Sequence, residues 1–226
     1  MDLGLDGRVA LVVGGTGFIG RAVVETLRGE GAVVVAAARH IDDGITLDAR
    51  DPASVAAAFA QVIEEHGRLD ALVVTAAPSA QTLDASRQAD PEQVLGAFDA
   101  KAMTFLRLAN AALPIMAEAG FGRIVGVSGQ NAFLTGNVTG SVRNAALIIA
   151  AKNLADSVAG SGITVNTVSP GTVVDAPSSE VQPGRGGESS PEQIADLIAF
   201  LVSPRSAAIS GESIATGHRV RGVTVL

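Results

Sequence analysis

The sequence predicts a single α/β domain in which parallel strands are joined by helices. Short runs of β-branched residues alternate with Ala- and Leu-rich segments of helical length, a pattern typical of parallel strands with crossover helices. A glycine-rich turn stands directly between the first run and the helical segment after it. The 226 residues are 47% hydrophobic and 17% charged, which is enough apolar material for one large core despite 26 glycines. We therefore expect one domain over residues 1–226 and exclude a disordered or collagen-like chain.

The expected strands are the β-branched runs. We predict them at residues 9–13, 32–37, 71–75, 123–128, 163–168 and 212–215, with a shorter strand at 45–47. Residues 40–44 alone separate the second strand from the short one. That spacing leaves no room for a helix between these two strands.

Prolines mark several helix boundaries. Ser190 is a predicted N-cap, with Pro191 at the first helical position and Gln193 three residues after the cap. Pro114 is expected to end or kink the long helix that begins near Pro91. Residues 176–190 are rich in Pro, Gly, Ser and Glu, so we expect them to form a mobile surface loop.

Charge and composition exclude several classes of function. The chain carries 16 basic and 23 acidic residues and no cysteine, which argues against a nucleic-acid surface, disulfides and thiolate chemistry. His and carboxylate residues do not cluster at metal-ligand spacing, and no Ser/His/Asp order supports a hydrolase. Asp2 and Asp6 stand where a signal peptide would be basic, and no apolar run approaches the ~18 residues of a membrane span. We expect a cytoplasmic protein, with no membrane association and no metal, whose partners are small molecules or copies of itself.

The first chemical motif is the glycine-rich turn. Its three glycines allow a tight turn, close approach of the backbone to a pyrophosphate, and close packing of helix on strand. The helix N-terminus would then face the phosphates with its unpaired N–H groups. An ordinary glycine-rich turn is the alternative, but the flanking strand and helix favour dinucleotide binding. The expected contacts from this segment are Gly14, Thr16, Gly17, Phe18, Ile19 and Gly20.

In order and spacing, six segments resemble the short-chain dehydrogenase/reductase family. They are the glycine turn and residues 69–73, 122–125, 152–155, 163–171 and 191–201. The resemblance implies a Rossmann-type doubly wound domain with a seven-stranded, mainly parallel sheet, helices on both faces and an NAD(P) site at the C-terminal edge of the strands. It also implies a homodimer or homotetramer. The apolar segment 144–151 suits a helix covered by the sheet on one side and by a subunit on the other.

The family's Tyr-x-x-x-Lys signature is missing. The segment from Gly140 to Asn144 takes its place, and the chain contains no tyrosine. The family serine aligns with Gly129, beside a surviving Ser128, and the family asparagine on the preceding helix aligns with Lys101. In the family, the tyrosine hydroxyl exchanges a proton with the carbonyl oxygen while hydride moves from the nicotinamide. This chain cannot use that acid.

Two classes of function therefore stay open. One is an atypical NADP(H)-dependent oxidoreductase that acts on a carbonyl or hydroxyl group of a small molecule, with a non-standard proton source. The other is a catalytically silent dinucleotide-binding homologue, acting as a redox sensor or partner subunit. Each candidate for the proton source also has a purely structural alternative as a backbone partner, a turn residue or a surface charge. The candidates are Lys101, Ser128, Gln130, Asn131, Arg143, His218 or a bound water.

We expect Lys101, Ser128 and Asn144 to form the catalytic site. Lys101 and Asn144 stand where the family has an asparagine and a lysine, so amine and amide have traded places. Gly140 and Asn144 share one helix face, and the missing tyrosine side chain is expected to leave open space beside Asn144. Lys101 would reach into this space and bond the nicotinamide ribose or a water, and burial would lower its pKa. The alternative is that Lys101 extends to solvent at the helix edge.

The end of the second strand bears on the choice of cofactor. NAD enzymes place a carboxylate there to hold the ribose 2′-hydroxyl, whereas this chain has Ala38 followed by Arg39, which fits a 2′-phosphate. NADP(H) is therefore the preferred cofactor. NAD(H) stays possible because Asp42 or Asp43 would favour it if either reached the ribose. Asp48 matches the family aspartate that contacts adenine, or else caps the following helix.

The resemblance implies further cofactor contacts after the fourth and sixth strands. The residues at the sixth strand would border the nicotinamide, and Thr172 would bond its carboxamide in preference to Asp175, with which the family threonine aligns. The loop at 176–190 would then lie on the substrate side. The contacts expected here are Ala76, Pro170, Gly171 and Thr172.

Overall fold

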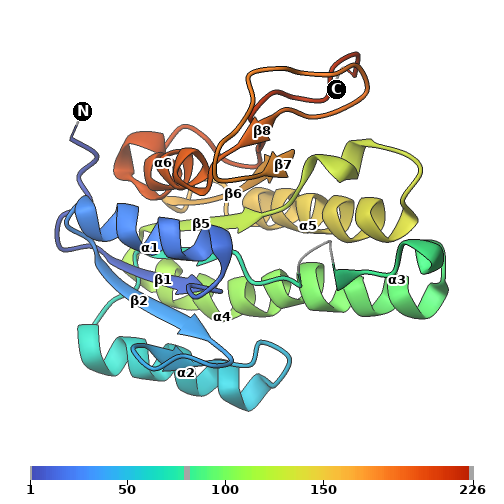
Figure 1. The fold of residues 1–226 in the computed structure, drawn as a ribbon. Helices are drawn as coiled ribbons and strands as arrows, with labels where there is room; N and C mark the ends of the chain where they lie inside the picture. The colour runs from blue at the N-terminus through green and yellow to red at the C-terminus, as the bar shows by residue number, and fades with distance from the viewer. Residues whose placement is uncertain (1, 79–81, 224–226) are drawn as a thin grey trace.

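The computed structural model describes residues 2–78 and 82–223. Its centre is a seven-stranded sheet in the order β3-β2-β1-β4-β5-β6-β9, in which every neighbouring pair is parallel (Figure 1). This confirms the predicted doubly wound α/β fold, and each predicted strand agrees with the observed one to within two residues at either end. The strands are β1 (Val9–Val13), β2 (Val33–Ala38), β3 (Ile45–Thr46), β4 (Ala71–Val74), β5 (Gly122–Val127), β6 (Ile163–Pro170) and β9 (Ser213–Thr216).

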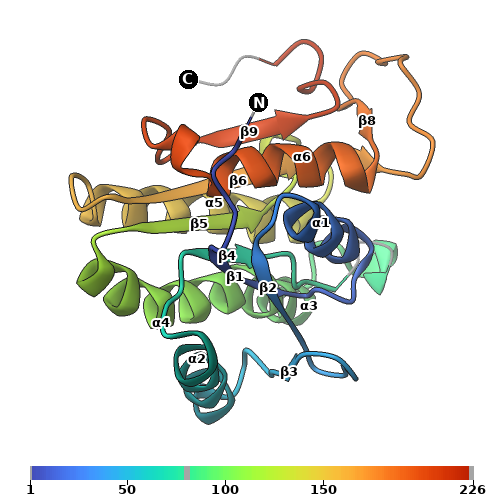
Figure 2. The same ribbon diagram turned by 90° about the vertical axis from the view of Figure 1, so that its left-hand side faces the viewer.

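Helices cover both faces of the sheet (Figure 2). They are α1 (Phe18–Gly29), α2 (Pro52–His66), α3 (Pro91–Phe98), α4 (Thr104–Ala119), α5 (Val138–Ser157) and α6 (Pro191–Val202). Helices α1 and α6 pack together on one face, and α2, α4 and α5 pack on the other. None of the helices in the described ranges is long and apolar enough to span a bilayer.

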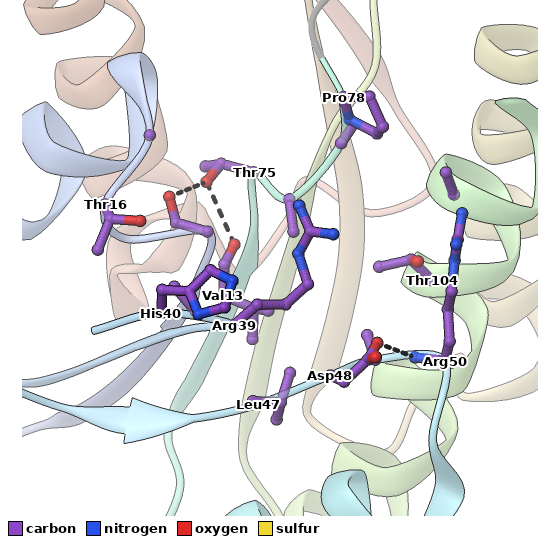
Figure 3. A pocket seen from close by; sticks show the side chains of 17 residues that line it. Val13, Thr16, Arg39, His40, Leu47, Asp48, Arg50, Thr75, Pro78 and Thr104 are labelled. Atoms are coloured by element: carbon purple, nitrogen blue, oxygen red, sulfur yellow. Dashed lines mark hydrogen bonds between the residues drawn. The ribbon is translucent and has the colours of Figure 1, made fainter.

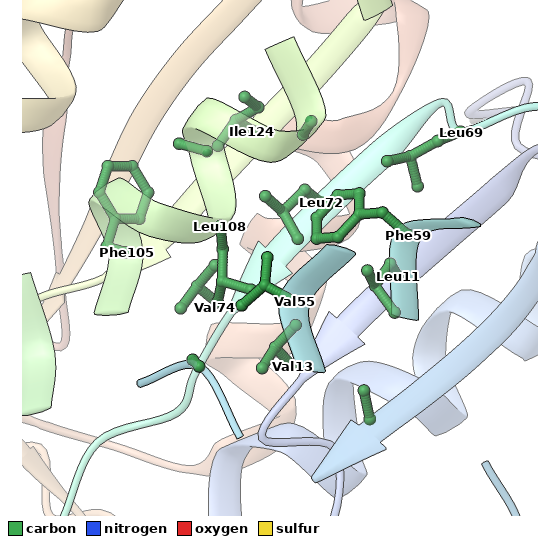
Figure 4. Packing of buried hydrophobic residues seen from close by; sticks show 14 of the residues in the cluster. Leu11, Val13, Val55, Phe59, Leu69, Leu72, Val74, Phe105, Leu108 and Ile124 are labelled. Atoms are coloured by element: carbon green, nitrogen blue, oxygen red, sulfur yellow. The ribbon is translucent and has the colours of Figure 1, made fainter. Parts of the chain in front are cut away.

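Two hydrophobic cores follow from the alternation of side chains along the strands. In β1, Leu11 and Val13 point into the core beneath α2 and α4, whereas Ala10 and Val12 point into the core beneath α1 and α6. Figure 4 shows the first of these cores, where Phe59 packs with side chains of β1 and β4. Because both faces of β1 are covered, its five residues are all apolar and all buried.

The predicted start of α6 is confirmed in detail. The Ser190 hydroxyl accepts from the backbone N–H of Gln193, and the Gln193 side chain accepts from the backbone N–H of Ser190. At α2 the cap is Asp51, whose carboxylate accepts from the N–H of Ala53 at 2.9 Å. The interpretation of Asp48 as the cap of this helix is therefore wrong.

The connection from β2 to β3 contains no helix, as predicted. Gly44 permits the tight return, because its φ is 148° and a Cβ there would collide with the carbonyl oxygen of Ala36. In the parallel pair of β2 and β3, Ala37 lies opposite Ile45. This short connection leaves the end of β2 open at the C-terminal edge of the sheet.

The long helical region that begins at Pro91 differs from the prediction. Helix α3 passes into a π-helical turn over Asp99–Met103 and then into α4, which continues through Pro114 to Ala119. Pro114 does not end the helix. It has no N–H to donate to the carbonyl oxygen of Asn110, but both residues are exposed, so water can bind this carbonyl instead. A π-helical turn is often found at functional sites, and this one carries Lys101.

The segment before α6 is part of a small second sheet. Strands β7 (Thr172–Val173) and β8 (Glu188–Ser189) pair in parallel, so the predicted loop 176–190 ends in a strand and a helix cap. Figure 1 shows this loop projecting from the domain beside the C-terminal segment. A bridge between Pro183 and Arg221 joins the two. The mobility of the loop stays a prediction.

Candidate active site

Close backbone contacts shape the glycine-rich turn between β1 and α1. Gly14 has a φ of 91°, and a Cβ there would lie 2.6 Å from Oγ1 of Thr75 and 2.7 Å from the backbone nitrogen of Ala76. A Cβ at Gly20 would collide with the carbonyl oxygen of Gly14. Glycine is therefore required at both positions, and the turn is pressed against the end of β4.

The first turn of α1 is suited to bind an anion. Gly17 is the N-cap residue and has no side chain to accept hydrogen bonds from the first N–H groups of the helix. The N-terminus of a helix carries partial positive charge, so these groups would bind a phosphate well. Thr16, just before the cap, is exposed beside them.

A cavity of about 380 Å³ lies beside this turn, at the C-terminal edge of β1, β2 and β4 (Figure 3). Arg39 extends from the end of β2 into it. A cavity of this kind, with glycines at its floor and a helix N-terminus at its wall, fits the adenosine and pyrophosphate part of a dinucleotide. Among the predicted cofactor contacts, those that line it are Gly14, Thr16, Gly17, Arg39, Asp48 and Ala76.

The lining of the cavity includes three basic side chains and one carboxylate, that of Asp48. Besides Arg39, it includes His40 and Arg50, which sequence reasoning missed because no motif marks them. Asp42 and Asp43, which would have favoured NAD, are exposed and do not line the cavity. Basic residues therefore outnumber carboxylates in the lining of the cavity.

The three predicted catalytic residues lie together beyond the end of β5. Nζ of Lys101 donates to the carbonyl oxygen of Ser128 at 2.9 Å, and Oγ of Ser128 donates to the carbonyl oxygen of Asn144 at 3.0 Å. All three residues are buried, and Lys101 is only 6% exposed. The alternative that Lys101 extends to solvent is therefore wrong.

The electrostatics of Lys101 are unusual for a lysine. Burial, and secondarily the charge of Arg143, lower the pKa of Lys101 from 10.5 to about 7. Arg143 is itself buried, and its Nη1 donates to the carbonyl oxygen of Pro78 at 3.1 Å. Pro78 lines the cavity, as does Ala100 beside Lys101. An amine with a pKa near 7 can both give and take a proton at neutral pH.

The expected open space beside Asn144 is not present at Gly140. A Cβ at Gly140 would lie 2.9 Å from Nδ2 of Asn137 and 3.3 Å from Nδ2 of Asn131, so these two amides lie directly against Gly140. Asn137 is held there because its Oδ1 caps α5, accepting from the N–H of Gly140 at 2.8 Å. Instead, Gly129 makes room for Asn144, since a Cβ there would lie 3.1 Å from Nδ2 of Asn144.

Other predicted residues lie away from the cavity. Gln130 is buried, and its Nε2 donates to the carbonyl oxygens of Thr216 and His218, so it holds the C-terminal segment in place. The residues after β6 are held by the second sheet, where the N–H of Thr172 donates to the carbonyl oxygen of Gly187 at 3.3 Å. The predicted cofactor contacts outside the cavity lining are Phe18, Ile19, Gly20, Pro170, Gly171 and Thr172.

No group of three or more His, Asp or Glu in residues 2–78 and 82–223 is arranged to hold a metal ion.

Comparison with known proteins identifies the family. Residues 16–217 match the model of the family described as Enoyl-(Acyl carrier protein) reductase. The chain belongs to the short-chain dehydrogenase/reductase family. It is 31% identical over 247 residues to 3-oxoacyl-[acyl-carrier-protein] reductase FabG of Escherichia coli, with 94% of this chain and 96% of the relative covered. It is 30% identical over 239 residues to the protein of the same name in Vibrio cholerae, with the same two shares covered.

The family fold extends over the whole domain. The crystal structure of gox2181 matches this chain with a TM-score of 0.80, covers 95% of both chains and is 24% identical in sequence, which is a likeness of fold. Within this short-chain dehydrogenase/reductase, the glycine cradle at Gly14 and Gly20 and the uncapped start of α1 fit a dinucleotide. The chain contains no tyrosine.

Proposed function

We propose that this short-chain dehydrogenase/reductase is an NADP(H)-dependent oxidoreductase that acts on a carbonyl or hydroxyl group of a small molecule, with Lys101 as the proton source in place of tyrosine. The observation that carries the proposal is the buried Lys101 amine, which is bonded to the carbonyl oxygen of Ser128, follows the cavity-lining residue Ala100 and has its pKa lowered to about 7. The names of the curated relatives, which are 3-oxoacyl reductases, support a carbonyl substrate.

We assign a part of the cofactor to each group of residues expected to bind it. Gly14, Thr16 and Gly17 would hold the pyrophosphate, Asp48 and Ala76 would contact the adenosine, and Arg39 would bind the 2′-phosphate. Pro170, Gly171 and Thr172 would border the nicotinamide. NADP(H), when bound, supplies or accepts the hydride. We favour it over NAD(H) because a guanidinium binds a phosphate by two parallel hydrogen bonds, whereas NAD(H) offers only a hydroxyl.

Lys101 would move the proton, and its neighbours would position it. As an ammonium, Lys101 has three N–H groups, of which one donates to the carbonyl oxygen of Ser128. Another would donate to the substrate oxygen and transfer its proton as the alcohol forms, and the neutral amine would take it back in the reverse direction. Ser128 is held in turn by its bond to the Asn144 carbonyl oxygen.

A second candidate function is dinucleotide binding without turnover. The observation that favours it is that Nζ of Lys101 and Oγ of Ser128 both already donate to backbone carbonyl oxygens. The chain also contains no tyrosine that could act as the proton donor instead of these two groups. Such a protein would act as a redox sensor or a partner subunit.

Cofactor binding is tested first, by fluorescence titration with NADPH and with NADH. We expect NADPH to bind at least roughly tenfold tighter, a difference of ~1.4 kcal/mol. Arg39→Ala should remove most of this preference, and Arg28→Ala, on α1 outside the cavity lining, should leave it unchanged. Equal affinities in the wild type would overturn the choice of NADP(H).

Turnover is tested by NADPH oxidation with simple ketones and 3-oxoacyl thioesters. General acid catalysis contributes roughly 10² to 10⁴ in rate, so Lys101→Met should lower turnover by a factor in that range. Lys152→Met, at the chain's other lysine, should leave turnover unchanged. No turnover of any substrate with NADPH bound would favour the silent binder.

A further inference from the structure

Two buried cations lie behind the lining of the cavity, because Arg143 donates to the carbonyl oxygen of Pro78 and Lys101 follows Ala100, and both Pro78 and Ala100 line it. Lys101 and Arg143 are 6% and 5% exposed, and they come from different elements, the π-helical turn and α5. Among the described residues neither forms an ion pair. Asp99, on the same turn as Lys101, is paired instead with Arg50 and Arg107.

The hydrogen bonds of the two cations are incomplete. Lys101 and Arg143 donate to the carbonyl oxygens of Ser128 and Pro78, which carry no net charge. Nε of Arg143 is buried and has no acceptor among the described residues. Arg123 is also buried but differs, because it donates to three backbone carbonyl oxygens and lies over the ring of Phe121.

Burial of two like charges is costly unless an anion compensates them. Their repulsion is already evident, since the charge of Arg143 adds to burial in lowering the pKa of Lys101. An anion between them would remove both costs. The place for it is beside Pro78 and Ala100 in the cavity lining, beyond the carboxyl end of β4, and ligands bind at this edge of the strands in open α/β sheets.

We propose that Arg143 and Lys101 bind a carboxylate of the substrate, so that this enzyme acts on a small carbonyl or hydroxyl compound that carries a carboxylate group. A guanidinium with a free Nε–H matches the two oxygens of a carboxylate, which favours this anion over a spherical one. This inference rests on the proposed function, since it names the substrate class of the same site.

The test uses malonate and its neutral analogue malonamide, measured by calorimetry with the NADP⁺-bound protein. We expect malonate to bind at least tenfold tighter than malonamide. Arg143→Gln should weaken malonate binding at least tenfold, whereas Arg87→Gln, an equal change of charge outside the cavity lining, should leave it unchanged. If the wild-type protein binds malonate and malonamide equally well, the proposal is wrong, whatever the variants show.

Proton uptake gives a second, independent measurement. At about pH 8, binding of a carboxylate should raise the pKa of Lys101 and draw in part of a proton. Calorimetry in two buffers of different ionisation enthalpy measures this uptake, which should vanish in Lys101→Met. Absence of uptake in the wild type would contradict the proposal. NADP⁺ affinity is measured in the same samples. Loss of NADP⁺ binding would contradict the proposed function, whereas normal NADP⁺ binding without malonate binding would contradict only the carboxylate site.

Discussion

Substitution of Lys101 should change how stability depends on pH. Lys101 has its ordinary pKa of 10.5 in the unfolded chain and a pKa of about 7 in the folded one. Between these values the unfolded chain binds one proton more than the folded chain, so the free energy of unfolding rises with pH. Each pH unit contributes about 1.4 kcal/mol, and the gain from about pH 6 to about pH 9 amounts to about 3 kcal/mol.

Urea unfolding of the apo protein at several pH values between these limits measures the effect. Lys101→Met has a side chain of similar length without a charge, so its free energy of unfolding should lack this rise. Lys152→Met is the matched control, because Lys152 is on the surface and paired with Asp156. We expect the control to retain the full rise.

The same data can refute the reasoning about the site. A wild type whose stability is flat through this range would mean that Lys101 loses no proton affinity on folding. A Lys101→Met protein that follows the wild-type slope would assign the rise to another group. Either result would remove the physical basis for Lys101 as a proton donor near neutral pH.

Three further predictions concern the turn, the base of the sheet and assembly. Gly14→Ala should lower the free energy of unfolding by about 2 kcal/mol or more and abolish NADPH binding, because the added Cβ would lie 2.6 Å from Oγ1 of Thr75 at a positive φ. Asp70→Asn should cost about 2 to 3 kcal/mol in urea unfolding, since the buried carboxylate accepts from two arginines and from a backbone N–H. Leu95 and Ile149 are 66% and 61% exposed on the packed helices α3 and α5, so we expect a homodimer or homotetramer through this face, and Leu95→Glu should shift light scattering toward the monomer.

Short-range sequence signals were sufficient for the sheet and for the glycine turn. Strand positions follow from runs of β-branched residues, and the start of α6 follows from the Ser190 capping box. Both depend on residues close together in sequence, so no long-range contact can alter them easily. Pro114 is the exception. The energetic cost of its missing N–H depends on whether water reaches the backbone carbonyl that has lost its donor, and only the folded surface decides this.

The identity of the site residues was available from the sequence, but their environment was not. The absence of tyrosine and the presence of lysine at position 101 are facts of the sequence. Whether the amine lies in solvent or in the interior depends on the π-helical turn and on the carbonyl of Ser128, which is distant in sequence. Likewise, Gly140 lies directly against Asn137 and Asn131, side chains that no spacing rule places there.

The sequence by itself determined the fold class, the glycine-rich turn at Gly14 and the absence of tyrosine. Only the tertiary structure decided that Lys101 and Arg143 are buried near one another and that no carboxylate pairs with them in the described part of the chain. The physical reason is that burial and charge interactions depend on distances in space, which residues from separate elements set when the helices close over the sheet.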